Sequence, residues 1–242
     1  MGIISDEIEK AVQALASETI EDIELPSYKS DPLLKKLNSL DTETWIDTGD
    51  LELAHSVWKQ ELSSLTTNNT LANQVVQTRV LDETIRSTIN KLKIVAPDLN
   101  EVDRILEIGF VINCKIALRL VKAFRKKVSV ELHPSISRDI GKTIEFARRY
   151  QKVCPKYFII KIPLTPEGYL SIRKLGKEGM PINFTLGFSA RQNYLAARLS
   201  NPNFVNVFLG RLNQVILDNS LGTGKGVGEK VTLATQLFIS EL

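Results

Sequence analysis

The second half of the chain alternates apolar, strand-like runs with amphipathic stretches of helical spacing. We predict strands at residues 128–132, 157–163, 181–186 and 203–209, which follow one another at intervals of roughly 20 to 30 residues. The run at 157–163 is almost continuously apolar, which is typical of a strand buried on both faces. Buried strands that alternate with helices predict an α/β fold in which helices cover a parallel sheet.

Two of the intervening helices carry recognisable boundary residues. Thr165 is a predicted N-cap followed by Pro166 at the first helical position, and Gly179 lies just beyond the expected end. Ser189 and Gln192 have the spacing of a capping box. These signals place one helix after the strand at 157–163 and another after the strand at 181–186.

The first half of the chain gives weaker signals. We predict short strands at 44–47 and 64–67, and two long helices between 71 and 124, the second of which begins at Pro97 and Asp98. Residues 1–43 are predicted to form a helical extension, and residues 44–242 an α/β barrel. Six predicted strands are fewer than the eight of a complete (β/α)₈ barrel, so we expect the barrel to be incomplete at its C-terminal end.

The composition argues against nucleic-acid binding, membrane insertion and a histidine-rich metal site. The formal net charge is +3, from 31 basic and 28 acidic residues, so we expect no nucleic-acid-binding surface. No apolar run reaches the ~18 residues of a membrane span, and we expect no membrane partner. Cys114 and Cys154 are interpreted as free buried thiols in a reducing, cytoplasmic location. His55 and His133 are the only histidines, which are too few for a typical metal cluster.

Polar residues interrupt or follow each of the six predicted strands near its C-terminal end. Barrel enzymes build their active sites at this end of the strands, so we predict one shared site there. The residues concerned are Asp47, Thr66, Asn68, Glu131, Lys161, Asn183, Thr185 and Arg211.

Lys161 is the most informative of these residues. On an alternating strand it shares a face with Ile159 and Pro163, and a barrel-facing position would remove its ammonium group from water. Burial disfavours the charged form, and a neutral amine can attack a carbonyl to form a Schiff base. The alternative interpretation is a lysine that reaches solvent from a strand end.

Several blocks of the sequence together form a recognisable pattern. They are Trp-Ile-Asp-Thr-Gly-Asp around Asp47, Thr-Thr-Asn at 66–68, Val-Glu ending at Glu131, Ile-Lys-Ile-Pro-Leu-Thr-Pro-Glu-Gly at 160–168, Ile-Asn-Phe-Thr-Leu-Gly-Phe-Ser at 182–189 and Phe-Leu-Gly-Arg at 208–211. These blocks resemble the transaldolase family over roughly residues 44 to 211, and more loosely to 242. Asp47 corresponds to the first-strand aspartate of that family.

The resemblance implies a (β/α)₈ TIM barrel of the class I, Schiff-base aldolase type that needs no metal and no other cofactor. The implied reaction belongs to the pentose phosphate pathway and transfers a dihydroxyacetone unit between sugar phosphates. Sedoheptulose 7-phosphate and glyceraldehyde 3-phosphate would give erythrose 4-phosphate and fructose 6-phosphate. The expected partners are therefore sugar phosphate substrates.

The resemblance also implies roles for individual residues. Lys161 would be the Schiff-base nucleophile, Glu131 a general acid and base acting through a water, and Asp47 the group that handles protons during carbon–carbon cleavage. Arg211 would bind phosphate. The remaining substrate-binding or supporting residues would be Thr66, Asn68, Asn183, Thr185, Ser189 and Asn206.

The chain departs from the family pattern in three respects. Asn206 and Val207 replace the usual Ser-Pro, Asn213 replaces a common acidic residue, and the last strands, with a second phosphate-binding arginine, have no counterpart before Leu242. An open barrel exposes a sheet edge, so we expect a second copy, a partner or further chain to cover it. Two alternatives follow: a barrel that is non-catalytic or active only on assembly, and a Schiff-base aldolase acting on a smaller sugar.

Overall fold

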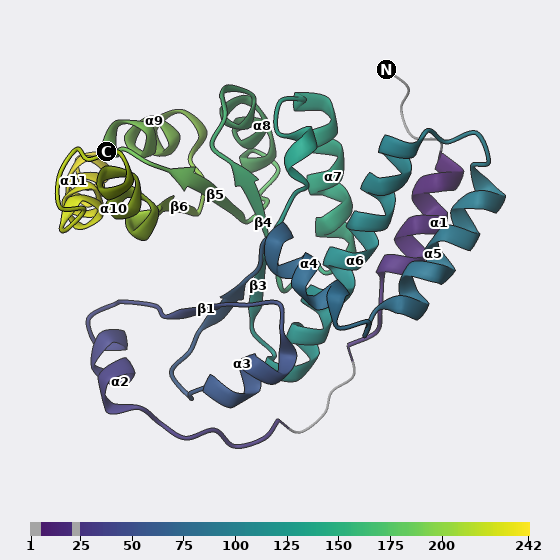
Figure 1. The fold of residues 1–242 in the computed structure, drawn as a ribbon, viewed down its shortest axis with the longest axis horizontal. Coiled ribbons are helices and arrows are strands. Elements are labelled where there is room, and N and C mark those ends of the chain that lie inside the picture. The colour runs from purple at the N-terminus through teal and green to yellow at the C-terminus, as the bar shows by residue number, and fades with distance from the viewer. Residues whose placement is uncertain (1–5, 21–24) are drawn as a thin grey trace. The chain divides into compact units, whose positions relative to one another are not determined.

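Six strands alternate with helices along residues 6–20 and 25–242, which are the residues described by a computed structural model (Figure 1). The strands are β1 (Trp45–Asp47), β2 (Ser64–Thr66), β3 (Lys127–Glu131), β4 (Phe158–Pro163), β5 (Ile182–Gly187) and β6 (Phe204–Val207). The helices are α1 (Asp6–Ala16), α2 (Pro32–Asn38), α3 (Leu51–Val57), α4 (Asn69–Gln77), α5 (Asp82–Val95), α6 (Glu101–Phe124), η1 (Pro134–Ile136), α7 (Ile140–Val153), α8 (Pro166–Gly176), α9 (Ala190–Ser200), α10 (Leu209–Asp218) and α11 (Val227–Ser240).

The described residues divide into two compact units. The first unit runs to His133 and also includes Arg148–Ile159, and the second comprises Pro134–Ala147 and Ile160–Leu242. The division passes through α7 and β4. In the first unit β1 pairs with β2 and β2 with β3, and in the second β4 pairs with β5 and β5 with β6. Every one of these pairs is parallel, as the sequence predicts, and the fold is an α/β fold of the (β/α)₈ TIM-barrel type with six strands described.

The first unit is built around β3 and the long helix α6, which pack against each other. Val128 and Val130 of β3 are fully buried because the strand is covered by α6. Helices α1 and α5 pack on α6 in turn. At the C-terminal end of α6, the buried rings of Trp58 and Phe124 stack with centroids 4.0 Å apart, which adds aromatic packing to the core of this unit.

In the second unit α9 packs against β5, β6 and α8, and α11 packs against both α9 and α10. All six residues of β4 are buried, in agreement with the apolar run that predicted a doubly covered strand. Thr165 caps α8 by accepting a hydrogen bond from the Gly168 N–H at 2.9 Å, and Pro166 occupies the first turn. The predicted boundary of this helix is therefore confirmed.

Two helix predictions in the first half were wrong. The stretch from 71 to 92 is two helices, because the chain leaves the helical conformation after α4 and Arg79 adopts a left-handed φ of 63°. Helix α6 begins at Glu101 and not at Asp98, because the Asn100 side chain accepts from the Asp103 N–H at 3.0 Å and so supplies the N-cap. Helix α2 lies within residues 1–43, which we predicted to form a helical extension.

A strand boundary near the C-terminal end also differs from the prediction. Strand β6 ends at Val207 and not at residue 209 as predicted, because α10 begins at Leu209 and has Gly210 and Arg211 in its first turn. Cys114 and Cys154 are free and buried, as predicted. Over the ranges that the structure describes, no helix combines the length and the apolar character needed to cross a membrane. The boundary predicted between residues 43 and 44 and the cytoplasmic location stay predictions.

Candidate active site

The register of the second unit places Lys161 of β4 directly beside Asn183 of β5. The next register pair on the same face of the two strands is Pro163 and Thr185. Lys161 is only 6% exposed, while Asn183 and Thr185 are 1% and 0% exposed. The lysine is buried because β4 is apolar on both sides of it, and this burial favours the interpretation of a lysine held out of water over one that reaches solvent.

Strand β6 brings Asn206 to the same face through an irregularity in β5. The pairing shifts between Phe184 and Gly187, and Leu186 adopts a φ of 71°, a left-handed conformation that is uncommon for residues other than glycine. Thr185 Oγ1 and Asn206 Oδ1 are buried and have no hydrogen-bond partner among the described residues. Both oxygens are available to a ligand that donates hydrogen bonds.

Asn193 of α9 lies behind this irregularity and is fully buried. Its Nδ2 donates to Thr235 Oγ1 at 3.4 Å and to the Asn206 carbonyl at 3.5 Å, which links α9, α11 and β6. A Cβ at Gly187 would lie only 2.2 Å from Asn193 Oδ1, so the glycine leaves the space that this asparagine fills. The sequence analysis missed Asn193, because a lone asparagine on a helix gives no signal of its own.

Ser189 and Arg211 are placed at the beginnings of two helices. Ser189 Oγ accepts from the Gln192 N–H at 3.2 Å and caps α9, as predicted. In a standard capping box the Gln192 side chain would accept from the backbone N–H of Ser189. Here its Oε1 accepts instead from the N–H of Phe188, one residue earlier, at 3.1 Å. Arg211 is exposed in the first turn of α10, where a guanidinium and the helix N-terminus together can hold a phosphate.

In the first unit, Glu131 lies at the N-terminal end of α4. Glu131 Oε2 accepts from the backbone N–H of Asn69 at 3.3 Å and from Asn69 Nδ2 at 3.4 Å. The same Nδ2 donates to the Leu132 carbonyl at 3.1 Å, so the amide is held against the end of β3. The positive end of a helix and two N–H donors favour the ionised form of a carboxyl group.

Asn69 is itself held by the interior of the first unit. Asn69 Oδ1 accepts from Asn113 Nδ2 at 3.3 Å, and Asn113 is hydrogen-bonded to the phenol of Tyr150. Tyr150 is 1% exposed, and burial raises the pKa of its hydroxyl well above the ordinary value, which keeps the phenol neutral. Glu131 is thus connected through two asparagines to the core.

The other predicted residues of the first unit lie near the same strand ends. Asp47 pairs in register with Thr66, and the aspartate is exposed while the threonine is half-buried. Thr66 Oγ1 has no hydrogen-bond partner among the described residues. Asn68 is the N-cap of α4, because its Oδ1 accepts from the Leu71 N–H at 2.9 Å. This structural use of Asn68 was not predicted, and it orients the helix end that meets Glu131.

The ten predicted site residues therefore fall into two sets. The set in the first unit comprises Asp47, Thr66, Asn68 and Glu131, and the set in the second comprises Lys161, Asn183, Thr185, Ser189, Asn206 and Arg211. Asn69, which contacts Glu131 directly, was missed although it follows the Thr-Thr-Asn block by one residue. Within residues 6–20 and 25–242, no three or more His, Cys, Asp or Glu side chains gather as a metal site would require.

Comparison with curated proteins gives matches to parts of several transaldolases. A probable transaldolase of Nitrosopumilus maritimus is 32% identical over 96 residues, which is 40% of this chain and 41% of the relative. Probable transaldolases of Brachyspira hyodysenteriae and Thermoanaerobacter sp. are 43% and 42% identical over 30% and 34% of this chain, and over 32% and 38% of their own lengths. The chain thus covers about two fifths or less of the length of these relatives.

A solved structure of tryptophan synthase subunit alpha from Legionella pneumophila is similar only weakly. The TM-score is 0.30 at 14% identity, over 90% of this chain and 100% of that one, which is too low to support an inference. The family model described as transaldolase/fructose-6-phosphate aldolase, in contrast, matches residues 44–238. Since this match covers most of the 242 residues, the chain belongs to the transaldolase/fructose-6-phosphate aldolase family.

Proposed function

We propose that this protein is a transaldolase that works through a Schiff base on Lys161. The observation that carries the proposal is the buried position of Lys161 beside Asn183 on adjacent parallel strands, in a chain of this family. The proposed reaction moves a dihydroxyacetone unit from a ketose phosphate such as sedoheptulose 7-phosphate to an aldose phosphate such as glyceraldehyde 3-phosphate.

The first step is attack of the neutral Lys161 amine on the keto carbon of the donor. The resulting carbinolamine loses water, and the iminium that forms withdraws electrons from the neighbouring carbon–carbon bond. When that bond breaks, the electron pair passes to the iminium as an enamine and the aldose product leaves. Attack of the enamine on the acceptor aldehyde, followed by hydrolysis of the iminium, releases the new ketose phosphate and restores the lysine.

Each of these steps moves a proton, and two carboxylates are proposed to move them. Glu131 accepts and returns the protons of carbinolamine formation and dehydration, and the two N–H groups of Asn69 support its ionised form. Asp47 takes the hydroxyl proton of the donor as the carbon–carbon bond breaks, and its exposure supports exchange with solvent. Different surroundings let two carboxylates hold different protonation states at one pH.

Recognition of the substrate is assigned to the amides, hydroxyls and guanidinium of the predicted set. The buried oxygens of Thr185 and Asn206, which have no partner among the described residues, support contacts with substrate hydroxyls or with a water. Arg211 in the first turn of α10 supports binding of the phosphate group. A smaller, unphosphorylated sugar would leave this cation unused.

Trapping with borohydride tests the proposal. Reduction in the presence of fructose 6-phosphate should leave a three-carbon adduct on Lys161, located by peptide mass spectrometry, and Lys161→Ala should leave none. Lys174→Ala is the matched control, since that lysine is exposed on α8 and should not alter labelling. An intact wild-type protein that is never labelled would contradict the Schiff-base mechanism. Labelling by dihydroxyacetone or fructose alone would favour an aldolase of smaller sugars.

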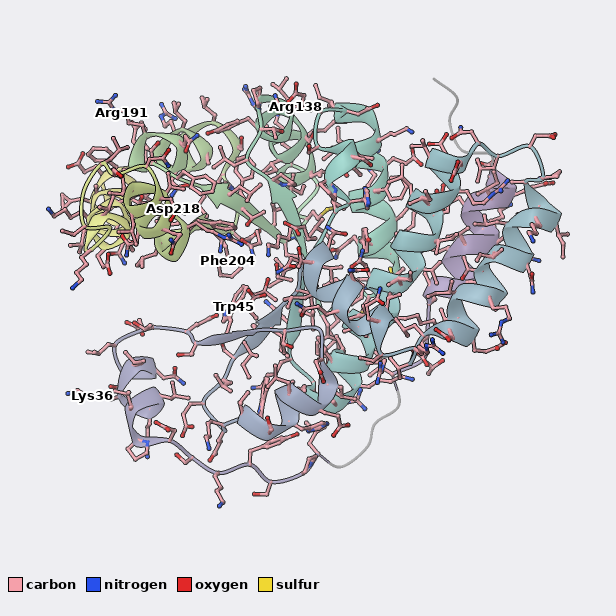
Figure 2. The ribbon with its side chains drawn as sticks, in the orientation of Figure 1. Lys36, Trp45, Arg138, Arg191, Phe204 and Asp218 are labelled. Atoms are coloured by element: carbon pink, nitrogen blue, oxygen red, sulfur yellow. The ribbon has the colours of Figure 1, made fainter. Side chains whose placement is uncertain are left out.

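A second candidate is a barrel whose activity depends on assembly. Phe204 of β6, marked in Figure 2, pairs in register with Asn183, and it is 37% exposed although it lies on the face that carries the site. An exposed aromatic side chain on this face favours a second copy of the chain that covers it. Specific activity that rises with protein concentration, in parallel with dimer formation measured by light scattering, would support this candidate. A fully active monomer would contradict it.

A further inference from the structure

The chain contains a hydrogen-bonded support for Glu131 that involves none of the predicted catalytic or substrate-binding side chains except Glu131 itself. Asn69 donates to Glu131 Oε2 twice, from its backbone at 3.3 Å and from its side chain at 3.4 Å. These contacts come from the first residue of α4, so the carboxylate also lies at the positive end of that helix.

The same side chain is fixed on its other side. The Leu132 carbonyl accepts from Asn69 Nδ2 at 3.1 Å, and Asn69 Oδ1 accepts from Asn113 Nδ2 at 3.3 Å. Asn113 also donates to the Gly109 carbonyl at 3.0 Å, and its side chain is hydrogen-bonded to Tyr150. The orientation of the Asn69 amide is therefore determined: the NH₂ group faces Glu131 and the oxygen faces Asn113.

We propose that Asn69 is a positioning residue, which holds the Glu131 carboxylate in one orientation and stabilises its charge between the proton transfers. This inference rests on the proposed function, because Glu131 needs a defined position only if it exchanges protons with the substrate. Asn69 acts through Glu131 alone, so its loss lowers kcat and leaves KM almost unchanged.

Two substitutions of Asn69 separate positioning from packing. Asn69→Ala removes the side-chain donor and should lower kcat by about tenfold, as expected for one long hydrogen bond to a charged group. Asn69→Asp keeps the shape and the acceptor for Asn113, but it faces Glu131 with a second carboxylate. Like charges at this distance disfavour the ionised base, so kcat should fall by about 100-fold, further than in the alanine variant.

A purely structural role predicts the opposite order, since the isosteric aspartate preserves the packing and the alanine does not. Asn38→Asp is the matched control, because Asn38 is an exposed asparagine at the end of α2 whose Nδ2 donates to the Glu61 carbonyl at 2.9 Å. It should leave kcat unchanged. An aspartate variant as active as wild type, or more active than the alanine variant, would overturn the proposal.

A second readout does not depend on turnover. The carboxyl carbon of Glu131, followed by NMR during a pH titration, should give a higher pKa in Asn69→Asp than in wild type, because of the added negative charge. Titrating or charged side chains of the same unit include Tyr150, which is linked through Asn113, and the buried pair of Glu107 and Arg149. An unchanged Glu131 titration would overturn the proposal. If Lys161→Ala and Glu131→Gln lose activity but Asn69→Asp keeps the activity of the wild type, the positioning role of Asn69 is refuted and the proposed function is not. If the wild-type protein forms no borohydride adduct, the proposed function itself is refuted.

Discussion

The surroundings of Glu131 in the first unit and of Thr185 in the second differ in how their polar side chains are satisfied. In the first unit, Glu131, Asn69, Asn113 and Tyr150 form one connected series of hydrogen bonds. In the second unit, buried oxygens of Thr185, Asn193 and Asn206 have no hydrogen-bond partner among the described residues. Buried polar groups without partners cost stability.

This difference indicates which chemical role the surroundings of Glu131 and of Thr185 each suit. A connected series fixes the position of a group before substrate arrives, which suits a general acid and base. Oxygens without partners destabilise the free protein and gain hydrogen bonds when a hydroxylated ligand binds, which suits substrate recognition. Thr66 of the first unit belongs with the second kind, since its Oγ1 is also without a partner. Whether a polar side chain has a hydrogen-bond partner therefore depends more on its proposed chemical role than on the unit in which it lies.

The largest expected effect concerns the ion pair behind the first unit's hydrogen bonds. Glu107 and Arg149 are each 1% exposed and form a two-pronged pair, one bond of which measures 2.8 Å. Glu107→Gln would leave the Arg149 charge buried without its counter-charge, and the free energy of unfolding should fall by about 3–5 kcal/mol. Urea denaturation followed by circular dichroism measures the loss.

The matched control is Glu83→Gln, because Glu83 pairs with Arg86 at 3.3 Å on an exposed helix face, with side chains 85% and 69% exposed. Its unfolding midpoint should not move, since exposed ion pairs contribute little. Equal midpoints for the Glu107 variant and wild type would show that the buried polar side chains of the first unit do not determine its stability. The contrast drawn with the surroundings of Thr185 would then be wrong.

A smaller effect is expected at Gly187 in the second unit. A Cβ there would lie 2.1 Å from the Asn206 carbonyl oxygen and 2.2 Å from Asn193 Oδ1, so Gly187→Ala must displace β6 or α9. The expected cost is about 1–3 kcal/mol in the free energy of unfolding, as for other overpacked sites. Substrate affinity should fall as well, because Asn206 moves with β6.

Gly210→Ala provides the comparison, since nothing lies within 4 Å of the added methyl group in the first turn of α10. That variant should be more stable than wild type by about 0.5–1 kcal/mol, because alanine favours the helix. If Gly187→Ala were as stable as Gly210→Ala, the close approach between β5, β6 and α9 would not be a constraint in solution.

Much of this fold could be predicted from the sequence because its signals are local. The apolar run at 157–163 and the cap formed by Thr165 and Pro166 depend on neighbouring residues only, and both predictions are confirmed. The break between α4 and α5 could not be predicted in the same way. Arg79 takes a left-handed conformation that its side chain does not favour, and the sequence there contains neither glycine nor proline.

The candidate site shows the same limit. Lys161 could be singled out because a lysine within an apolar strand is conspicuous, and its burial agrees with that interpretation. Asn69 and Asn193 could not, because their importance depends on contacts with Glu131 and Asn206, which are 62 and 13 residues away in the chain. Long-range hydrogen bonds leave no periodic pattern in a sequence.

The smallest expected effect, and the one that tests the comparison most directly, is Thr185→Val. Thr185 is fully buried, and its hydroxyl has no hydrogen-bond partner among the described residues. Valine has nearly the same shape and removes only the unsatisfied hydroxyl. The free energy of unfolding should therefore stay within about 0.5 kcal/mol of wild type or rise. Activity should nevertheless fall if, as we propose, this hydroxyl binds the catalytic water or the substrate.

Thr143→Val is the matched control from the same unit, since Thr143 is 2% exposed and its Oγ1 donates to the Ile136 carbonyl at 2.9 Å. Here the same chemical change removes a buried hydrogen bond, while the Ile136 carbonyl still accepts from the Asp139 N–H at 2.9 Å. The expected loss is about 0.5–1.5 kcal/mol with normal activity. Two buried threonines of one unit would then respond in opposite ways, one in stability and the other in turnover. A Thr185→Val variant that loses stability as Thr143→Val does would show that its hydroxyl is already satisfied in the folded protein. The surroundings of Thr185 would then not differ in this respect from those of Glu131.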